Sequence, residues 1–139
     1  AFVRVPFITE PLVAVFSPKL ALHSHQMLTL KDICAYDILI QDNTSVEQEV
    51  FLKFCKTSSV SPKVTSLPSS SVIDFAQKGL GIAIMLESVA EVLATPDMCI
   101  LPIEHSPVVR VSLLYRKDEP LSPIGREFLD FLKNWNINA

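Results

Sequence analysis

The sequence predicts an α/β fold, and three observations support this prediction. Short apolar runs rich in β-branched residues, such as residues 12–16, are typical of strands buried on both faces. Between residues 37 and 86 such runs alternate with helical patterns in the order strand, helix, strand, helix, strand. The 139 residues are 49% hydrophobic and 19% charged, so the chain can bury a substantial core and global disorder is excluded.

The first part of the chain is predicted to contain two strands. Residues 2–7 form one short apolar stretch that contains a proline, and residues 9–11 bridge it to a second run at 12–16. We expect the second run to be a buried strand in a parallel sheet. Residues 28–33 follow a polar stretch and resemble one helical turn that leads into a strand at 37–41.

The central part is predicted to continue as helix, strand, helix and strand. Turn and N-cap residues at 42–45 precede a helix that ends near residue 57, with its apolar residues at helical spacing. A strand at 63–67 leads to a helix that starts after Pro68. Gly79 ends this helix, because glycine accepts the left-handed C′ conformation, and residues 82–86 form the next buried strand.

The last part is predicted to add a short helix at 88–93 and a strand at 98–103. Apolar and polar residues alternate from 109 to 116, which indicates a half-exposed strand that is antiparallel to its neighbours. Ser122 and Pro123 open a final helix. The apolar residues of this helix line one stripe and are Ile124, Phe128, Phe131, Leu132 and Trp135.

Charge and hydropathy exclude several functional classes. Twelve Lys and Arg against fifteen Asp and Glu give a net charge of −3, so this chain lacks the basic footprint of a nucleic-acid-binding domain. No apolar run approaches the roughly 18 residues that span a bilayer, and we find no secretory signal, so we expect no membrane contact and a cytoplasmic location.

The sequence contains no motif of an enzyme or a metal site. There is no nucleophile elbow, phosphate-binding glycine loop or pair of helical histidines, so we expect no catalytic residue, cofactor or metal. His23 and His25 lie in a polar loop and are interpreted as solvated. Cys34, Cys55 and Cys99 are far apart in the sequence and are expected to be reduced packing residues.

Hydroxyl and amide side chains follow three of the predicted strands. These candidate ligand-binding residues are Ser17, Asn43, Thr44, Ser45, Ser66 and Ser69. In open α/β sheets ligands bind beyond the carboxyl ends of the strands, where helix N-termini attract anions. We therefore expect the three groups to converge on one cleft. The alternative is that each serine caps only its own helix.

Five segments resemble the effector-binding domain of LysR-type transcriptional regulators. They are residues 10–22, 30–33, 79–84, 116–123 and 128–132, and they occur in the order and spacing of that family across almost the whole chain. Residues 2–4 before a proline are also similar to the branch that regulates the degradation of aromatic compounds.

The resemblance implies a periplasmic-binding-protein type II-like domain with two α/β lobes joined by crossing strands. Residues 1–30 and 91–139 are expected in lobe I and residues 31–90 in a complete lobe II, with the N-terminal half of lobe I absent from this chain. Ser17 and the loop at residues 66–69 match positions that line the family's cleft. The family's usual polar pair before the helix is replaced here by Leu67 and Pro68.

The expected function is therefore a ligand-sensing regulatory domain without catalysis. A small-molecule effector, such as a carboxylate or another anion, would bind in the cleft. DNA contacts would come from an N-terminal helix-turn-helix outside this chain. The resemblance also implies self-association to a dimer or larger oligomer through residues 45–57 and 37–41. The alternatives are a transporter's solute-binding module with the same fold and an enzyme, such as a dehydratase, on the same two-lobe plan.

Overall fold

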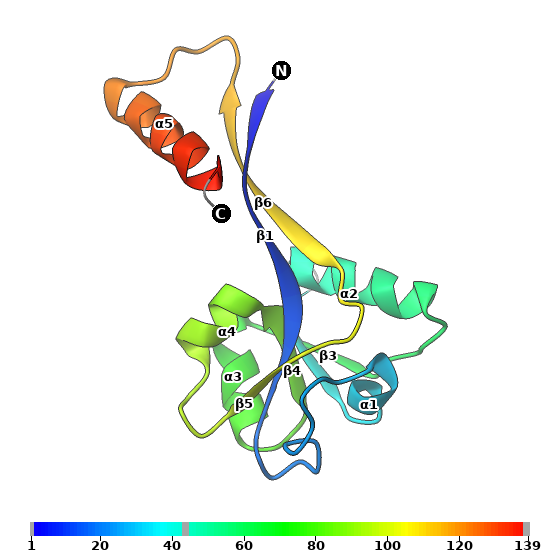
Figure 1. The fold of residues 1–139 in the computed structure, drawn as a ribbon. Coiled ribbons are helices and arrows are strands. Elements are labelled where there is room, and N and C mark those ends of the chain that lie inside the picture. Colours follow the sequence, from blue (N-terminus) through cyan, green and yellow to red (C-terminus); the bar gives the residue numbers. More distant parts are fainter. Residues whose placement is uncertain (1, 43–44, 138–139) are drawn as a thin grey trace. The chain divides into compact units, whose positions relative to one another are not determined.

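The computed structural model describes residues 2–42 and 45–137, and its mixed α/β fold confirms the predicted class (Figure 1). The chain divides into two compact units. The larger unit holds residues 11–109, and the smaller one combines the chain up to residue 10 with the chain from residue 110. The expected lobe boundaries after residues 30 and 90 both fall inside the larger unit, so the assignment of lobes remains a prediction.

The larger unit is built on a mixed sheet. Its strands are the second part of β1 (Phe2–Phe16), β2 (Ile38–Gln41), β3 (Val64–Leu67), β4 (Ile82–Leu86) and β5 (Cys99–Pro102), in the spatial order β3-β2-β4-β1-β5. A further strand, β6 (Val108–Arg116), pairs with β1. β2 runs parallel to both β3 and β4, whereas β1 is antiparallel to both β4 and β5.

Strand β1 corrects two expectations. It is one continuous strand from Phe2 to Phe16 and not two strands, and its second half is antiparallel to its neighbours. Pro11 does not interrupt the strand, since the ladder with β4 starts at Leu12 and the ladder with β5 starts at Val13. Because both faces of this segment are buried, its sequence carries no alternation that would distinguish an antiparallel strand from a parallel one.

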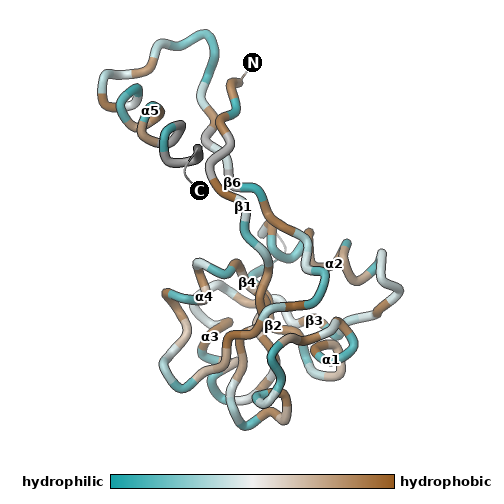
Figure 2. The backbone as a smooth tube through the Cα atoms, viewed as in Figure 1, coloured by the Kyte–Doolittle hydropathy of each residue, from teal (hydrophilic) through white to brown (hydrophobic). Residues whose placement is uncertain are grey.

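Four helices cover the two faces of this sheet. They are α1 (Leu30–Cys34), α2 (Val46–Thr57), α3 (Ser69–Gln77) and α4 (Glu87–Leu93). One apolar cluster joins Leu12 and Phe16 to Phe51 of α2, and the opposite cluster joins Val13 and Val15 to Val72 of α3. Figure 1 shows α1 and α2 on one side of the strands and α3 and α4 on the other, and Figure 2 shows the apolar strands between them.

Local capping accounts for where these helices begin and end. The Thr29 hydroxyl accepts a hydrogen bond from the Asp32 N–H while the Asp32 carboxylate accepts one from the Thr29 N–H, a capping box that starts α1. Gly79 adopts a φ of 78° after α3, as predicted, and the Leu80 N–H returns to the Phe75 carbonyl. Among the described helices, none has both the length and the hydropathy required to cross a membrane.

Strand β2 also corrects an expectation about self-association. Ile38 and Ile40 are buried in the apolar cluster that contains Phe51 of α2, and Leu39 is buried in the opposite cluster. The expectation that this strand presents apolar residues to a partner subunit is therefore wrong. On α2, the exposed apolar side chains are Val46 and Leu52.

The smaller unit contains the first part of β1, most of β6 and helix α5 (Pro123–Ile137). In α5 the predicted apolar stripe is largely exposed, since Ile124, Phe128 and Phe131 are 79%, 52% and 61% exposed, and the buried residue is Leu129. The side chains of Leu132 and Trp135 lie outside the described part of the chain. Two strand segments and one helix offer too little surface to cover a complete helical stripe.

Candidate functional site

The carboxyl ends of β2 and β4 form the candidate site. The two strands are parallel neighbours, and Ile38 of β2 pairs with Ile82 of β4. After β2 the chain passes to α2 on one face of the sheet, and after β4 it enters α4 on the opposite face. Connections that leave adjacent parallel strands towards opposite faces open a crevice at the strand ends, where α/β proteins bind ligands.

A cavity of about 60 Å³ lies at this edge, and we call it the edge cavity. Its lining comes from the ends of β2 and β4, from the first turns of α2 and α3, and from both ends of α4. The polar lining residues are Gln41, Glu47 and Ser69, and the apolar ones are Val72, Ile84, Met85, Leu86, Val89 and Leu93.

Ser45 and Ser66 do not line the cavity, but both are hydrogen-bonded to Gln48. The Ser45 hydroxyl accepts a hydrogen bond from the Gln48 N–H at 3.2 Å and donates one to the Gln41 carbonyl at 3.2 Å. The Ser66 hydroxyl donates to Gln48 Oε1 at 3.1 Å. These bonds tie the end of β2 to the first turn of α2 and to β3, so the two predicted serines are brought together.

The capping alternative holds for one serine and fails for another. Ser45 is the N-cap of α2, as predicted. Ser69 is not a cap, because Pro68 occupies the N-cap position of α3 and no side chain bonds there. Ser69 lines the edge cavity instead.

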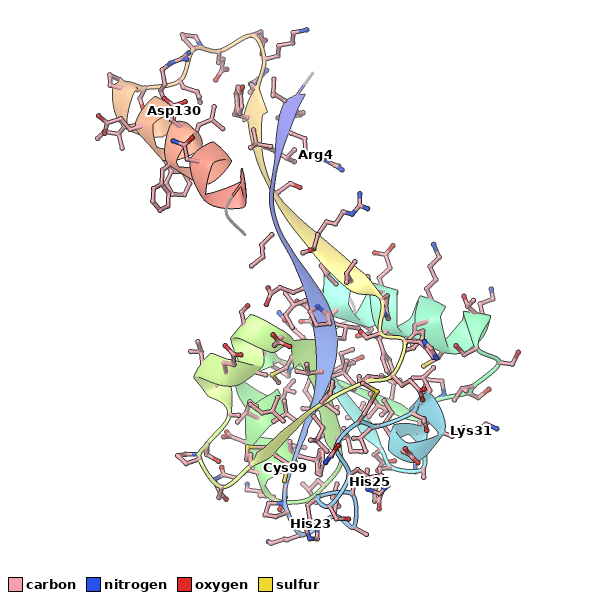
Figure 3. All side chains as sticks on the ribbon, in the orientation of Figure 1. Arg4, His23, His25, Lys31, Cys99 and Asp130 are labelled. Carbon is pink, nitrogen blue, oxygen red and sulfur yellow. The ribbon has the colours of Figure 1, made fainter. Side chains whose placement is uncertain are left out.

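Ser17 is not at this edge, which corrects the expectation of one shared cleft. Because β1 is antiparallel to β4, the residue after Phe16 lies at the amino ends of the parallel strands. Ser17 is 3% exposed, and its hydroxyl accepts a hydrogen bond from the Lys19 N–H at 3.2 Å. Figure 3 shows His23 and His25 at that same end. Asn43 and Thr44 lie outside the described residues.

Gln41, Glu47 and Gln48 were not among the residues predicted from the sequence. A signal for two of them was present, since Glu47 and Gln48 lie in the first turn of the helix that Ser45 caps, directly after the end of β2. Glu47 also follows the preference for acidic residues in a first turn, where the helix dipole favours negative charge.

The histidines and cysteines of the described chain do not form a second chemical centre. His23 and His25 are exposed, and no group of three His, Cys, Asp or Glu among the described residues is arranged to hold a metal. The three cysteines are free thiols. Burial raises the pKa of Cys55 to about 12, with a further contribution from the neighbouring Cys34 thiol, so Cys55 is a poor nucleophile at neutral pH.

Two larger hollows lie away from the strand ends, along α2. Their volumes are about 220 and 350 Å³, and both are lined by Phe54. Val50 and Pro107 line one, and Val60 and His105 line the other. We call the two together the α2 groove. Of the predicted ligand-binding residues that the structure describes, none lines this groove and Ser69 lines the edge cavity, so the edge cavity is the better candidate for a small ligand.

Comparison with known proteins gives one family and a consistent fold. The family profile described as the LysR substrate binding domain matches residues 1–136. The search of curated proteins found no match. Among solved structures, the fold is similar to the effector-binding domain of QuiR in complex with shikimate, with a TM-score of 0.83 and 18% identity. It is equally similar to the regulatory domain of Synechocystis PCC6803 CcmR in complex with 2-PG, with a TM-score of 0.83 and 19% identity.

The chain spans only part of these proteins. The alignments cover 99% and 96% of this chain but 66% of each of those two chains. CbnR, a LysR family transcriptional regulator, has a TM-score of 0.79 at 18% identity, and the alignment covers 96% of this chain and 47% of CbnR. At these identities the structural matches show the fold alone.

Proposed function

Because this chain belongs to the LysR substrate binding domain family, we propose that it is the effector-sensing part of a transcription regulator and has no catalytic activity. The observation that carries the proposal is the family match over residues 1–136. The buried and weakly nucleophilic Cys55 thiol is consistent with a binding role.

The proposed effector site is the edge cavity. QuiR and CcmR are solved as complexes with shikimate and 2-PG, which supports a small organic molecule as the class of effector. The crevice between the ends of β2 and β4 is where such a fold binds ligands, and the Ser45 hydroxyl holds the backbone of Gln41, which lines the cavity.

The proposed mechanism is a population shift. An effector favours whichever arrangement of the domain binds it better, and this preference is transmitted to DNA-binding domains elsewhere in the protein. Couplings of this type are typically about 1–3 kcal/mol, or roughly 5- to 150-fold in affinity. With a net charge of −3, this chain itself is not expected to bind DNA, and the setting of such a regulator is the cytoplasm.

We further propose that the chain self-associates through the α2 groove. Its lining residues Val50 and Phe54 are half-buried, and the neighbouring Leu52 is exposed. Apolar surface of this type favours a protein partner. The proposed surface retains α2 from the expected dimer surface, and the other residues that line the α2 groove take the place of β2.

A thermal-shift screen of small organic molecules tests the effector site. At a hundredfold excess over Kd, a ligand of the folded state stabilises it by about 2.7 kcal/mol, which raises Tm by several degrees. Val89 lines the edge cavity and Val92 lies 81% exposed on the same helix, so Val89→Trp and Val92→Trp form a matched pair. We expect a hit to stabilise the wild type and the Val92 variant but not the Val89 variant. Equal stabilisation of all three would place the effector elsewhere.

A further inference from the structure

The lining of the edge cavity limits the chemistry of its ligand. Val72 and Ile84 are buried, whereas Val89 and Leu93 are 37% and 45% exposed, so the apolar lining runs from the core to solvent. A volume of about 60 Å³ holds an apolar group of a few carbon atoms and is too small for a complete ligand of ordinary size. The cavity is therefore a subsite for one apolar end of a ligand.

The charge at this subsite is negative. No Lys, Arg or His occurs among its described lining residues, and its charged side chain is that of Glu47. Glu47 lies in the first turn of α2, where the partial positive charge of the helix N-terminus favours a carboxylate. The chain thus supplies its own anion at the point where an anionic ligand would otherwise be attracted.

The backbone donors of α2 are also partly occupied from within the chain. The Gln48 N–H donates to the Ser45 hydroxyl, and the Glu49 N–H donates to the Ser45 carbonyl at 3.5 Å. Two features favour an anion, namely the N-termini of α3 and α4, which have no side-chain cap. The Ser71 N–H bonds the Pro68 carbonyl, so the α3 end is partly satisfied, and α4 carries the acidic Glu87 in its own first turn.

From this lining we propose that the edge cavity binds the apolar end of a ligand whose adjacent polar group is a cationic amine that pairs with Glu47, and that it disfavours carboxylates and phosphates. The inference rests on the proposed effector site. It replaces the expectation of an anionic effector. Gln41 and Ser69 supply further oxygen acceptors for the N–H groups of such an amine.

Three probes of one shape test this inference: 3-methylbutylamine, 3-methylbutan-1-ol and 3-methylbutanoate. Each is titrated into the 139-residue chain, and the amide chemical shifts of Ser69, Val72 and Val89 are followed by NMR. We expect the amine to bind at least about tenfold more tightly than the carboxylate, with the affinity of the alcohol between them. Added salt should reduce the difference in affinity between the amine and the carboxylate and leave the affinity of the neutral alcohol unchanged.

Two first-turn variants separate the charge at the cavity from the charge of the helix. Glu47→Gln is expected to bring the amine and the carboxylate to within about twofold of each other. Glu49→Gln removes an exposed carboxylate of the same turn that does not line the cavity, and it should leave the preference unchanged. If both variants reduce the preference for the amine equally, the preference comes from the overall negative charge of the helix start, and the specific role of Glu47 is wrong.

The remaining outcomes are also decisive. If the carboxylate binds as tightly as the amine and shifts the same three amides, the inference is wrong while the proposed effector site stands. If the probes bind but shift other amides, the proposed site itself is wrong. If no probe shifts any amide up to its solubility limit, the edge cavity is not a ligand subsite and the inference fails.

Discussion

Gly81 sets the distance between β2 and β4, and its replacement by alanine gives the sharpest stability prediction. A Cβ atom at this position would lie 2.5 Å from the Asp37 carbonyl oxygen and 3.0 Å from Leu39 Cγ. The first of these contacts is with backbone, and that same oxygen accepts the Ile82 N–H at 2.9 Å. The carbonyl therefore cannot move away without weakening the first bond between the two strands.

The magnitude follows from these two contributions. Overpacking a buried position costs about 1–3 kcal/mol, and losing one hydrogen bond costs about 1 kcal/mol more. We expect Gly81→Ala to lower the free energy of unfolding by about 2–4 kcal/mol, measured by urea denaturation followed by circular dichroism.

Gly79→Ala provides the comparison that tests the reasoning. Gly79 has a φ of 78°, and an added Cβ would meet only the Lys19 side chain, at 3.6 Å and 3.9 Å. Its replacement by alanine should lower the free energy of unfolding by about 1–2 kcal/mol, because alanine is strained in the left-handed backbone conformation. A Gly81 variant as stable as the wild type, or a Gly79 variant that loses more stability than the Gly81 variant, would refute the argument from close strand approach.

The remaining predictions concern caps, thiols and assembly. Ser45→Ala should cost about 1 kcal/mol in urea unfolding because it removes the N-cap of α2, whereas Ser58→Ala at the exposed end of that helix should cost far less. The hydrogen bond from the Thr29 N–H lowers the pKa of Asp32 below 3.8, so this carboxylate stabilises the fold above that pH and its contribution is lost as pH falls through the lowered value. Asp32→Asn should therefore be less stable than the wild type at pH 7 and equal to it in strong acid; a difference that persists there would contradict the capping box. With a pKa of about 12, Cys55 should resist iodoacetamide in the folded chain and react at the ordinary thiol rate in urea, as read by mass spectrometry. Sedimentation velocity across a dilution series should show a concentration-dependent oligomer, and a strictly monomeric profile would contradict assembly through the α2 groove.

The positions of the helices and strands were largely predictable because short-range chemistry decides them. The N-cap at Ser45, the end of α2 near residue 57 and the left-handed Gly79 each depend on contacts within a few residues. The family resemblance extended these local patterns to the complete fold, which the match over residues 1–136 supports.

The candidate site was only partly predictable, and Ser17 shows why. Its hydroxyl follows a strand just as that of Ser69 does, but the direction of β1 relative to β4 places it at the opposite end of the sheet. Strand direction is set by pairing between distant segments. A strand buried on both faces shows the same apolar run in either direction.

The sequence alone therefore determined the α/β class, most element boundaries and the serine cap beside the edge cavity. Only the tertiary structure decided that Glu47 lines this cavity, that Ser17 does not, and that Leu129 is buried in α5 while Phe128 is exposed. The physical reason is that helical spacing and hydropathy specify which residues share a face, whereas the burial of that face depends on which other segments pack against it.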